Sequence, residues 1–254
     1  MIRFEQVSKR LGGAVVLDAI DYEIDANETF VIVGASGAGK SVSLKHMVRL
    51  LTPDSGRVLI GDDCVSAARG QELDRIRNRF GFLFQSAALL QWLTVADNVG
   101  LPLRMKTNMT DAEIDRRVRE KLDMVNLADA FDKQPADLSG GMRKRVGLAR
   151  AIINDPEIIL YDEPTSGLDP VTSRTIDRLI DRLRSELGVT SVVVTHDLHS
   201  ALAIGTRIAM LHDGKIVELS EPQEFVKSEN KFVKGFLEAQ YITTQGDWDN
   251  AEAS

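Results

Sequence analysis

A glycine-rich loop at residues 34–41, Gly-Ala-Ser-Gly-Ala-Gly-Lys-Ser, has the residue types and spacing to bind phosphate. An apolar, β-branched run precedes the loop at 30–33, and a helix-like pattern follows it at 40–51. Glycines let backbone N–H groups approach an anion, and the positive end of the following helix attracts phosphate. In this context Lys40 would reach the β- and γ-phosphates of a nucleotide, and the Ser41 hydroxyl would hold Mg²⁺. The loop therefore predicts binding of a nucleoside triphosphate through Gly34, Ala35, Ser36, Gly37, Ala38, Gly39, Lys40, Ser41 and Val42.

Two adjacent carboxylates, Asp162 and Glu163, follow an apolar strand that we expect at 158–161. An aspartate at the end of a buried strand can hold Mg²⁺ beside the serine of the loop. Because side chains alternate along a strand, we expect Glu163 to point to the opposite side from Asp162. From there it would polarise a water molecule for attack on the γ-phosphate, while Lys40 and the metal stabilise the developing charge. The pair predicts hydrolysis as well as binding.

The elements that must position these residues alternate between strand and helix outside the middle of the chain. We expect short strands over 2–28 with a turn at Gly12-Gly13, a strand at 57–61, a helix at 71–78 and a strand at 80–84. Later in the chain we expect strands at 158–161, 192–195, 207–211 and 215–218, a helix from Asp169-Pro170 to Gly188, and a helix at 222–240. Helices that follow buried strands imply a largely parallel sheet covered on both faces.

The middle of the chain, residues 86–155, has no convincing strand pattern. Residues 110–113, Thr-Asp-Ala-Glu, have the form of a capping box, and apolar residues follow at helical spacing. A second helix should run from Gly140 or Gly141 to residue 153. We therefore expect an α/β fold with a nucleotide-binding core (1–85 and 156–220) of parallel sheet and N-terminal antiparallel strands, an inserted α-helical subdomain (86–155), and a C-terminal helix and tail (221–254).

Composition and charge limit the class of protein. The 254 residues carry a formal net charge of −7, which argues against nucleic acid as a partner. We interpret the basic run at 143–145 as a solvated helix face with a role near the nucleotide. No apolar run reaches the ~18 residues needed to span a bilayer, so a membrane role would need a separate membrane subunit. The single cysteine, Cys64, excludes an intrachain disulfide and a cysteine-based zinc site.

Further motifs connect these residues to a known family. Residues 138–151 read Leu-Ser-Gly-Gly-Met-Arg-Lys-Arg-Val-Gly-Leu-Ala-Arg-Ala and resemble the signature motif and helix of ABC (ATP-binding cassette) ATPases. Other motifs match in family order: Gln85 the Q-loop, Asp162-Glu163 the Walker B pair, residues 166–169 the D-loop, and His196 the switch histidine. The resemblance covers residues 1–220 and implies a P-loop ATPase that hydrolyses ATP with the help of Mg²⁺.

The resemblance also assigns roles to single residues. The implied catalytic residues are Glu163, His196, Lys40 and Gln85, and the implied Mg²⁺ ligands are Ser41, Gln85 and Asp162. His196 would contact the γ-phosphate and orient the attacking water. Ser139, Gly140 and Gly141 lie at a predicted helix N-terminus, which favours binding of an anion. In this family one chain cannot close its own signature onto its own loop, so the resemblance implies a head-to-tail homodimer that sandwiches two ATP molecules.

Two departures from the family pattern stand out. Leu11 is at the position where many members carry an aromatic residue that stacks on adenine, and Met142 is at the fifth signature position, where Gln is usual. Together with residues 40–42 and 84–89, Met142 resembles the ATPases of Mla-type transporters. Those systems use a lipid-binding MCE-domain protein and move phospholipids or other lipids between bacterial membranes. Residues 89–99 would then receive a cytoplasmic helix of an integral membrane permease, with the chain peripheral on the cytoplasmic face of the inner membrane.

Other functions stay open at this point. One is an importer ATPase for an amino acid or another small solute, and another is a non-transport ABC ATPase in DNA repair or iron–sulfur assembly. A non-catalytic binding module is a further alternative, but intact Lys40, Glu163 and His196 argue against it. The segment 243–254 has no periodic apolar face and cannot fold alone. We expect it to extend onto the second subunit with Trp248 as an anchor, or else to be a functionless end.

Overall fold

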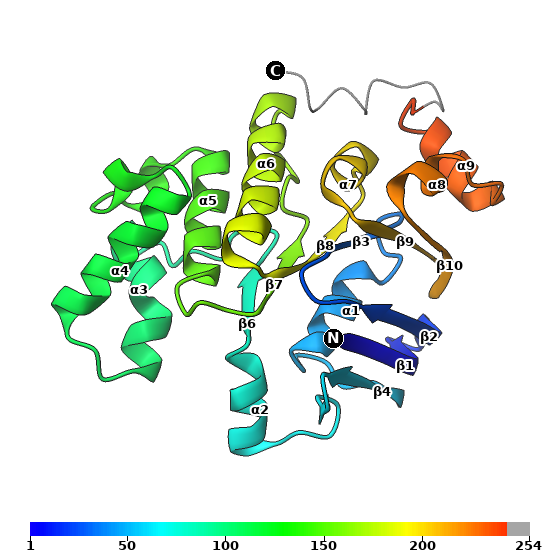
Figure 1. The fold of residues 1–254 in the computed structure, drawn as a ribbon, viewed down its shortest axis with the longest axis horizontal. Coiled ribbons are helices and arrows are strands. Elements are labelled where there is room, and N and C mark those ends of the chain that lie inside the picture. Colours follow the sequence, from blue (N-terminus) through cyan, green and yellow to red (C-terminus); the bar gives the residue numbers. More distant parts are fainter. Residues whose placement is uncertain (243–254) are drawn as a thin grey trace.

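The computed structural model describes residues 1–242, and its framework is a six-stranded sheet in the order β10-β9-β3-β8-β7-β6 (Figure 1). These strands are β3 (Thr29–Val33), β6 (Phe80–Leu83), β7 (Ile158–Asp162), β8 (Thr190–Thr195), β9 (Arg207–His212) and β10 (Lys215–Ser220). All neighbours pair in parallel except β10, which is antiparallel to β9. Every residue of β3, β7 and β8 is buried, as expected for parallel strands covered on both faces.

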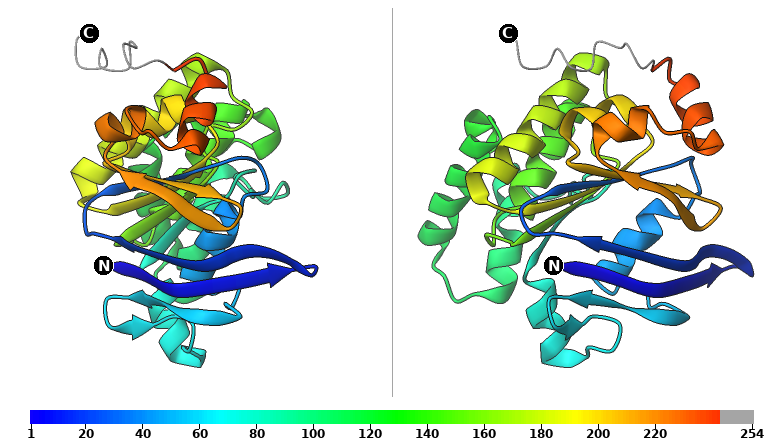
Figure 2. Two further views of the ribbon diagram at one scale, coloured as in Figure 1. Left: turned by 90° about the vertical axis from the view of Figure 1, so that its right-hand side faces the viewer. Right: turned by 45° about the vertical axis from the view of Figure 1, so that its right-hand side comes forward.

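A second, antiparallel sheet is built from the N-terminal part of the chain. It contains β1 (Ile2–Leu11), β2 (Ala14–Ile24), β4 (Ser55–Ile60) and β5 (Asp63–Cys64) in the order β2-β1-β4-β5. The turn at Gly12-Gly13 is confirmed, but the short strands predicted over 2–28 are instead two long ones that pair along most of their length. Helix α1 (Lys40–Met47) lies between the two sheets (Figure 2). This helix is shorter than the predicted 40–51.

Strand β3 divides the interior into two hydrophobic cores. Phe30 and Ile32 point toward α1 and the antiparallel sheet, while Val31 and Val33 point toward the helices on the opposite face. The two-residue period of a strand explains this division. The sheet is thereby held rigidly on both sides, and its strand ends are fixed in position.

Residues 86–155 contain helices and no strand, and they form one end of the molecule (Figure 1). The elements are α3 (Val95–Lys106), α4 (Asp111–Met124), α5 (Gly140–Ala151) and the 3₁₀ turns η1 (Ala128–Ala130) and η2 (Pro135–Asp137). The capping box of Thr110 and Glu113 is confirmed at the start of α4. Helix α3 was not predicted. Its start signal is the Thr94 side chain, which accepts from the Asp97 N–H, but Pro102 inside the helix obscures the pattern.

The remaining helices are α2 (Gly70–Arg77), α6 (Pro170–Leu187), α7 (Leu198–Ile204), α8 (Pro222–Val226) and α9 (Lys231–Glu238). Helix α6 has the predicted Asp169 cap and Gly188 end. The single helix predicted at 222–240 is wrong, because Asn230 caps a new helix by accepting from the Phe232 N–H. Within residues 1–242 no helix is long and apolar enough to cross a bilayer. The segment 243–254, with Trp248, lies outside the described residues.

Candidate active site

A cavity of about 1280 Å³ opens at the carboxyl ends of four parallel strands. The glycine-rich loop follows β3, Gln85 follows β6, Glu163 follows β7, and His196 follows β8. This edge is where open α/β sheets bind their ligands. The sequence-predicted residues that line the cavity are Ala35, Ser36, Gly37, Gly39, Lys40, Ser41, Val42, Gln85, Glu163 and His196. The D-loop residues Ser166, Gly167 and Leu168 line it as well.

The glycine-rich loop is pressed against β2 as it enters α1. Gly39 has φ 104, and a Cβ atom there would lie 2.8 Å from the Val16 carbonyl oxygen, so the position admits only glycine without strain. The Lys40 side chain is 6% exposed, and its Nζ donates to the carbonyls of Gly34 at 2.8 Å and Ala35 at 3.1 Å. The loop thus holds its lysine against its own backbone, at the N-terminus of α1.

Ser41 and Asp162 lie in direct contact. The Ser41 hydroxyl donates to Asp162 Oδ1 at 2.6 Å, and Asp162 is the last residue of β7. Although Asp162 does not itself line the cavity, this bond brings its carboxylate to the first turn of α1. The two oxygen donors that the sequence assigned to one metal site are therefore adjacent.

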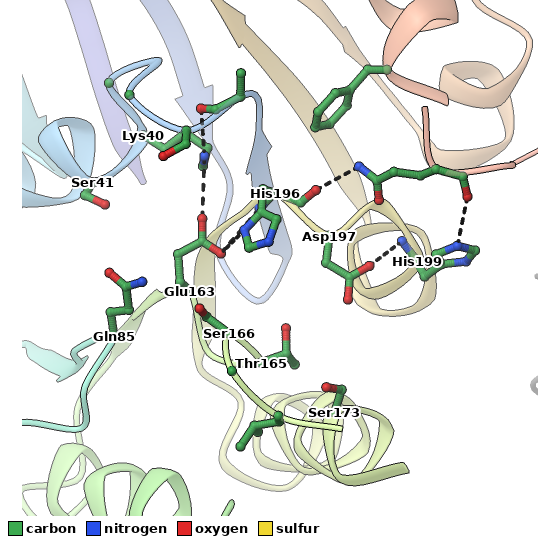
Figure 3. Close-up of a pocket in the computed structure, with 18 of the residues that line it drawn as sticks. Lys40, Ser41, Gln85, Glu163, Thr165, Ser166, Ser173, His196, Asp197 and His199 are labelled. Carbon is green, nitrogen blue, oxygen red and sulfur yellow. Dashed lines mark hydrogen bonds and ion pairs between the residues drawn. The ribbon is translucent and has the colours of Figure 1, made fainter. Parts of the chain in front are cut away.

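Glu163 does not point away from the loop as the strand pattern predicted. The strand ends at Asp162, and Glu163 adopts the left-handed conformation with φ 49, so alternation along a strand no longer applies. Its Oε1 lies 3.5 Å from Lys40 Nζ, and its Oε2 lies 2.8 Å from His196 Nδ1 (Figure 3). Both carboxylates therefore face the glycine-rich loop, and Glu163 connects Lys40 to His196.

The loop that carries His196 is held by a residue that no motif predicted. The Gln240 side chain, just after α9, donates to the His196 carbonyl at 2.8 Å and accepts from the Leu198 N–H at 2.9 Å. Gln240 and Phe236 also line the cavity. His199 lines the cavity too, and its Nε2 lies 3.3 Å from the Gln240 carbonyl oxygen. No local sequence signal connects position 240 to this loop.

The basic run 143–145 is not a solvated helix face. Lys144 is 5% exposed, and its Nζ donates to the Gln85 carbonyl at 2.5 Å and the Glu163 carbonyl at 2.8 Å. Arg145 does not line the cavity and donates instead to the Val125 and Asn126 carbonyls at the end of α4, so the predicted role near the nucleotide does not hold for it. Burial lowers the pKa of Lys144 to about 8 against the opposing influence of Glu163 and Asp162, so the ammonium form still dominates at pH 7. The run contains an interior cation that contacts two active-site loops.

The signature residues lie apart from this cavity. Ser139 caps α5 by accepting from the Met142 N–H at 3.2 Å, and Gly140 and Gly141 form the first turn. None of Ser139, Gly140 and Gly141 lines the cavity that contains Lys40. Leu11 does line it, with 40% of its surface exposed. One chain therefore assembles the loop, carboxylates and histidine but not the signature.

The assembled groups suit phosphoryl chemistry. A phosphate over the N-terminus of α1 would meet backbone N–H groups and the Lys40 ammonium. Glu163 beside it can accept a proton from water, and its hydrogen bond from His196 fixes the orientation of the carboxylate. Such an arrangement can activate water against a bound terminal phosphate.

Sequence relatives agree with this chemistry. Residues 17–166 match the family model described as ABC transporter. The chain is 40% identical over 248 residues to the methionine import ATP-binding protein MetN of Xanthomonas euvesicatoria pv. vesicatoria (strain 85-10), covering 95% of this chain and 74% of that protein. It is 37% identical over 241 residues to the probable ribonucleotide transport ATP-binding protein mkl of Mycobacterium leprae (strain TN), covering 95% and 70% respectively.

Solved structures agree as well. The dimeric ATP-binding cassette MJ0796 in a post-hydrolysis state, bound to ADP and Pi, has a TM-score of 0.80 and 36% identity, covering 87% of this chain and 99% of that one. The protein cbiO1 from Clostridium perfringens, part of the ABC transporter complex cbiONQ, has a TM-score of 0.81 and 26% identity, with 94% of each chain covered. From the site and these similarities together, this chain belongs to the ABC transporter family as an ATP-binding subunit that hydrolyses ATP.

Proposed function

We propose that Glu163 is the general base of ATP hydrolysis in this chain. The observation that carries the proposal is the position of its carboxylate, 2.8 Å from His196 Nδ1 and 3.5 Å from Lys40 Nζ. His196 orients the attacking water and contacts the γ-phosphate, while Lys40 stabilises the charge that develops on the phosphate. Gln85, which lines the same cavity, contacts Mg²⁺ or the attacking water.

We infer that the metal of the reaction is Mg²⁺, which would be held beside Ser41. Within residues 1–242 no group of three or more His, Cys, Asp or Glu could hold a metal ion by itself. The Ser41 hydroxyl, the Asp162 carboxylate and the Gln85 amide would supply hard oxygen ligands, and phosphate oxygens of ATP would complete the set. Bound there, Mg²⁺ neutralises charge on the β- and γ-phosphates.

The working unit is a head-to-tail homodimer attached to membrane permease subunits. The signature residues 139–141 lie outside the cavity of their own chain, which supports a role at the ATP of a second copy. MJ0796 is described as dimeric and cbiO1 as part of a transporter complex, which supports the same assembly here. The chain then lies peripherally on the cytoplasmic face of the inner membrane.

The proposed cargo is a phospholipid or another lipid, delivered to or from an MCE-domain partner protein. The support is the resemblance of Met142 and of residues 40–42 and 84–89 to Mla-type ATPases. Import of a small solute is the second candidate, and the names of the relatives favour it, since one is a methionine importer and another a probable ribonucleotide transporter.

Purification of the intact complex decides between these cargoes. A tagged chain is isolated from detergent-solubilised membranes of its own host, its partners are identified by mass spectrometry, and the bound lipids are extracted. An MCE-domain protein, together with ATPase activity stimulated by phospholipid, is expected. A small-solute permease whose ATPase responds to L-methionine or a nucleotide and not to lipid would contradict lipid transport. Partners that are all non-membrane proteins would contradict transport itself.

A further inference from the structure

Lys144 occupies a position between two catalytic loops that no motif assigns to it. It lies in the second turn of α5, after the Ser139 cap, and its side chain crosses the interior to the carboxyl ends of β6 and β7. Its Nζ donates at 2.5 Å to the carbonyl of Gln85 and at 2.8 Å to that of Glu163. A single ammonium group thus joins the Q-loop to the residue that acts on water.

The two loops have no backbone ladder to hold them together at this point. The parallel pairing of β6 and β7 ends at Leu83 and Tyr161, and the chain then bends at Glu163, whose φ is 49. The bond to the Glu163 carbonyl is buried and the bond to the Gln85 carbonyl is partly buried, so both carbonyls need donors from beyond the ladder. Lys144 supplies them to both loops, and its charge is tolerated in the interior because two carbonyl dipoles and nearby carboxylates surround it.

The same face of α5 holds the rest of the Q-loop. Gly147 lies one turn beyond Lys144, and a Cβ atom there would be 2.8 Å from the Leu83 side chain and 3.1 Å from that of Ala87. One turn further, Arg150 donates to the Ala87 carbonyl at 2.5 Å and the Ala88 carbonyl at 2.8 Å.

Ala87 and Ala88 both adopt left-handed backbone conformations, with φ 60 and 47, which non-glycine residues rarely do. Such a segment persists when its surroundings hold it. Here α5 provides those contacts, through the guanidinium of Arg150 and the close approach at Gly147. The main chain after Gln85 is therefore fixed to the signature helix.

We propose that Lys144 is a positioning residue that fixes the main chains of Gln85 and Glu163 to the signature helix. A displacement of α5 then moves the Q-loop glutamine and the general base together, relative to Lys40 and Ser41 on α1. Because Ser139 stands at the start of the same helix, any ligand that moves this helix start also moves both groups. The proposal rests on the proposed role of Glu163 as general base and does not depend on the cargo.

The test compares Lys144→Met with Arg145→Met in the full chain. Arg145 is a matched control, because it is also a cation of α5 that donates to two backbone carbonyls. Its acceptors are the Val125 and Asn126 carbonyls at the end of α4, outside the catalytic loops. We expect K144M to lower kcat by about 10²-fold, as a catalytic group misplaced by ~1 Å does, with KM for ATP within about threefold. R145M should leave kcat within about threefold of wild type. Lys144→Arg, which keeps charged donors for both carbonyls, should recover most of the loss.

Hydrogen exchange provides a readout independent of catalysis. K144M should speed amide exchange in residues 84–88 and 163–166, and R145M should speed it in 123–127 instead. Equal losses of kcat in the two methionine variants, unchanged exchange at 84–88 in K144M, or no recovery in K144R would overturn the proposal. If K144M does not fold, Lys144→Gln and Arg145→Gln replace the two methionine variants in the same measurements. The glutamine amide at position 144 is shorter than lysine and reaches at most one of the two carbonyls, so the same results are expected.

Discussion

Glu163 receives contacts from three separate segments of the chain, two on its carboxylate and one on its backbone carbonyl. Lys40 approaches it from the glycine-rich loop, His196 from the end of β8, and Lys144 holds its backbone from α5. The left-handed backbone at Glu163 turns the side chain toward these partners. At the scale of residues, the site is therefore organised around Glu163, which several independent contacts hold in position.

Replacing this carboxylate by an amide tests its role. Glu163→Gln keeps the size of the side chain and can still accept a hydrogen bond from His196, but it cannot take a proton from water. We expect kcat to fall by at least about 10²-fold with the dissociation constant for ATP within about threefold, as for loss of a general base. Rapid-quench hydrolysis and equilibrium nucleotide binding check the two values. Turnover within a few fold of wild type would exclude Glu163 as the base.

Leu11 provides a second test at this scale. It lines the cavity and is 40% exposed, so an aromatic ring in its place could stack on adenine. Leu11→Tyr should tighten ATP binding by about 1–3 kcal/mol, the usual contribution of a base stacked on a ring. Inorganic tripolyphosphate, which has no base, is the control ligand and should bind as before. An unchanged ATP dissociation constant, or an equal gain for tripolyphosphate, would show that adenine does not lie against this residue.

Contacts between elements extend the site beyond its motifs. Helix α6, which follows the D-loop, is joined to α7 by Asp177, whose carboxylate oxygens accept from the Ser200 hydroxyl at 2.7 and 2.8 Å. Asp177 is 3% exposed, and Arg174 lies 3.7 Å away on the cavity side. Burial raises the pKa of Asp177 to about 6, which its bonds from Ser200 and the nearby Arg174 only partly offset.

A dependence of stability on pH follows from this raised pKa. Between about pH 4 and 6 the folded chain keeps a proton on Asp177 that the unfolded chain has lost, so its contribution to stability falls as the pH rises through this window. Asp177→Asn stays neutral throughout. The free energy of unfolding of this variant, relative to that of wild type, should therefore increase by on the order of 1–3 kcal/mol from pH 4 to pH 8. Urea unfolding across that pH range measures it. A difference between the two proteins that is the same at pH 4 and pH 8 would contradict this account.

Local sequence patterns predicted the parts of the site that depend on neighbouring residues. Each motif residue lies at the end of a strand that is recognisable from its apolar, β-branched residues. This holds for the glycine-rich loop, Asp162, Glu163 and His196. Lys144 contacts carbonyls 59 and 19 residues away, and Gln240 contacts a loop 44 residues away. Such contacts depend on how α5 and α9 pack against the sheet, which no periodicity encodes. The orientation of Glu163 was missed for a related reason, since the backbone leaves the strand at that residue.

At the scale of the whole molecule, the six-stranded sheet separates two cores and exposes its catalytic edge between them. The antiparallel sheet and α1 support the glycine-rich loop from one side, and α6, α7 and α9 support Glu163 and His196 from the other (Figure 2). The helical end of the molecule, with α3 to α5, places the signature residues outside the cavity of their own chain. In the described part of the chain the signature residues and the cavity that contains Lys40 are therefore separate, as the proposed head-to-tail dimer requires.

The most direct measurement of the central claim is therefore the mass of the chain in solution with ATP. Glu163→Gln, which should bind ATP without hydrolysing it, is expected to change from 28.0 kDa to twice that mass when ATP and Mg²⁺ are added. The same variant carrying Ser139→Arg, which blocks the signature helix start but leaves the glycine-rich loop intact, should still bind ATP and stay at 28.0 kDa. Light scattering gives both masses. A chain that stays monomeric with ATP, or dimerises equally well with Ser139→Arg, would contradict a site completed by the signature of a second copy.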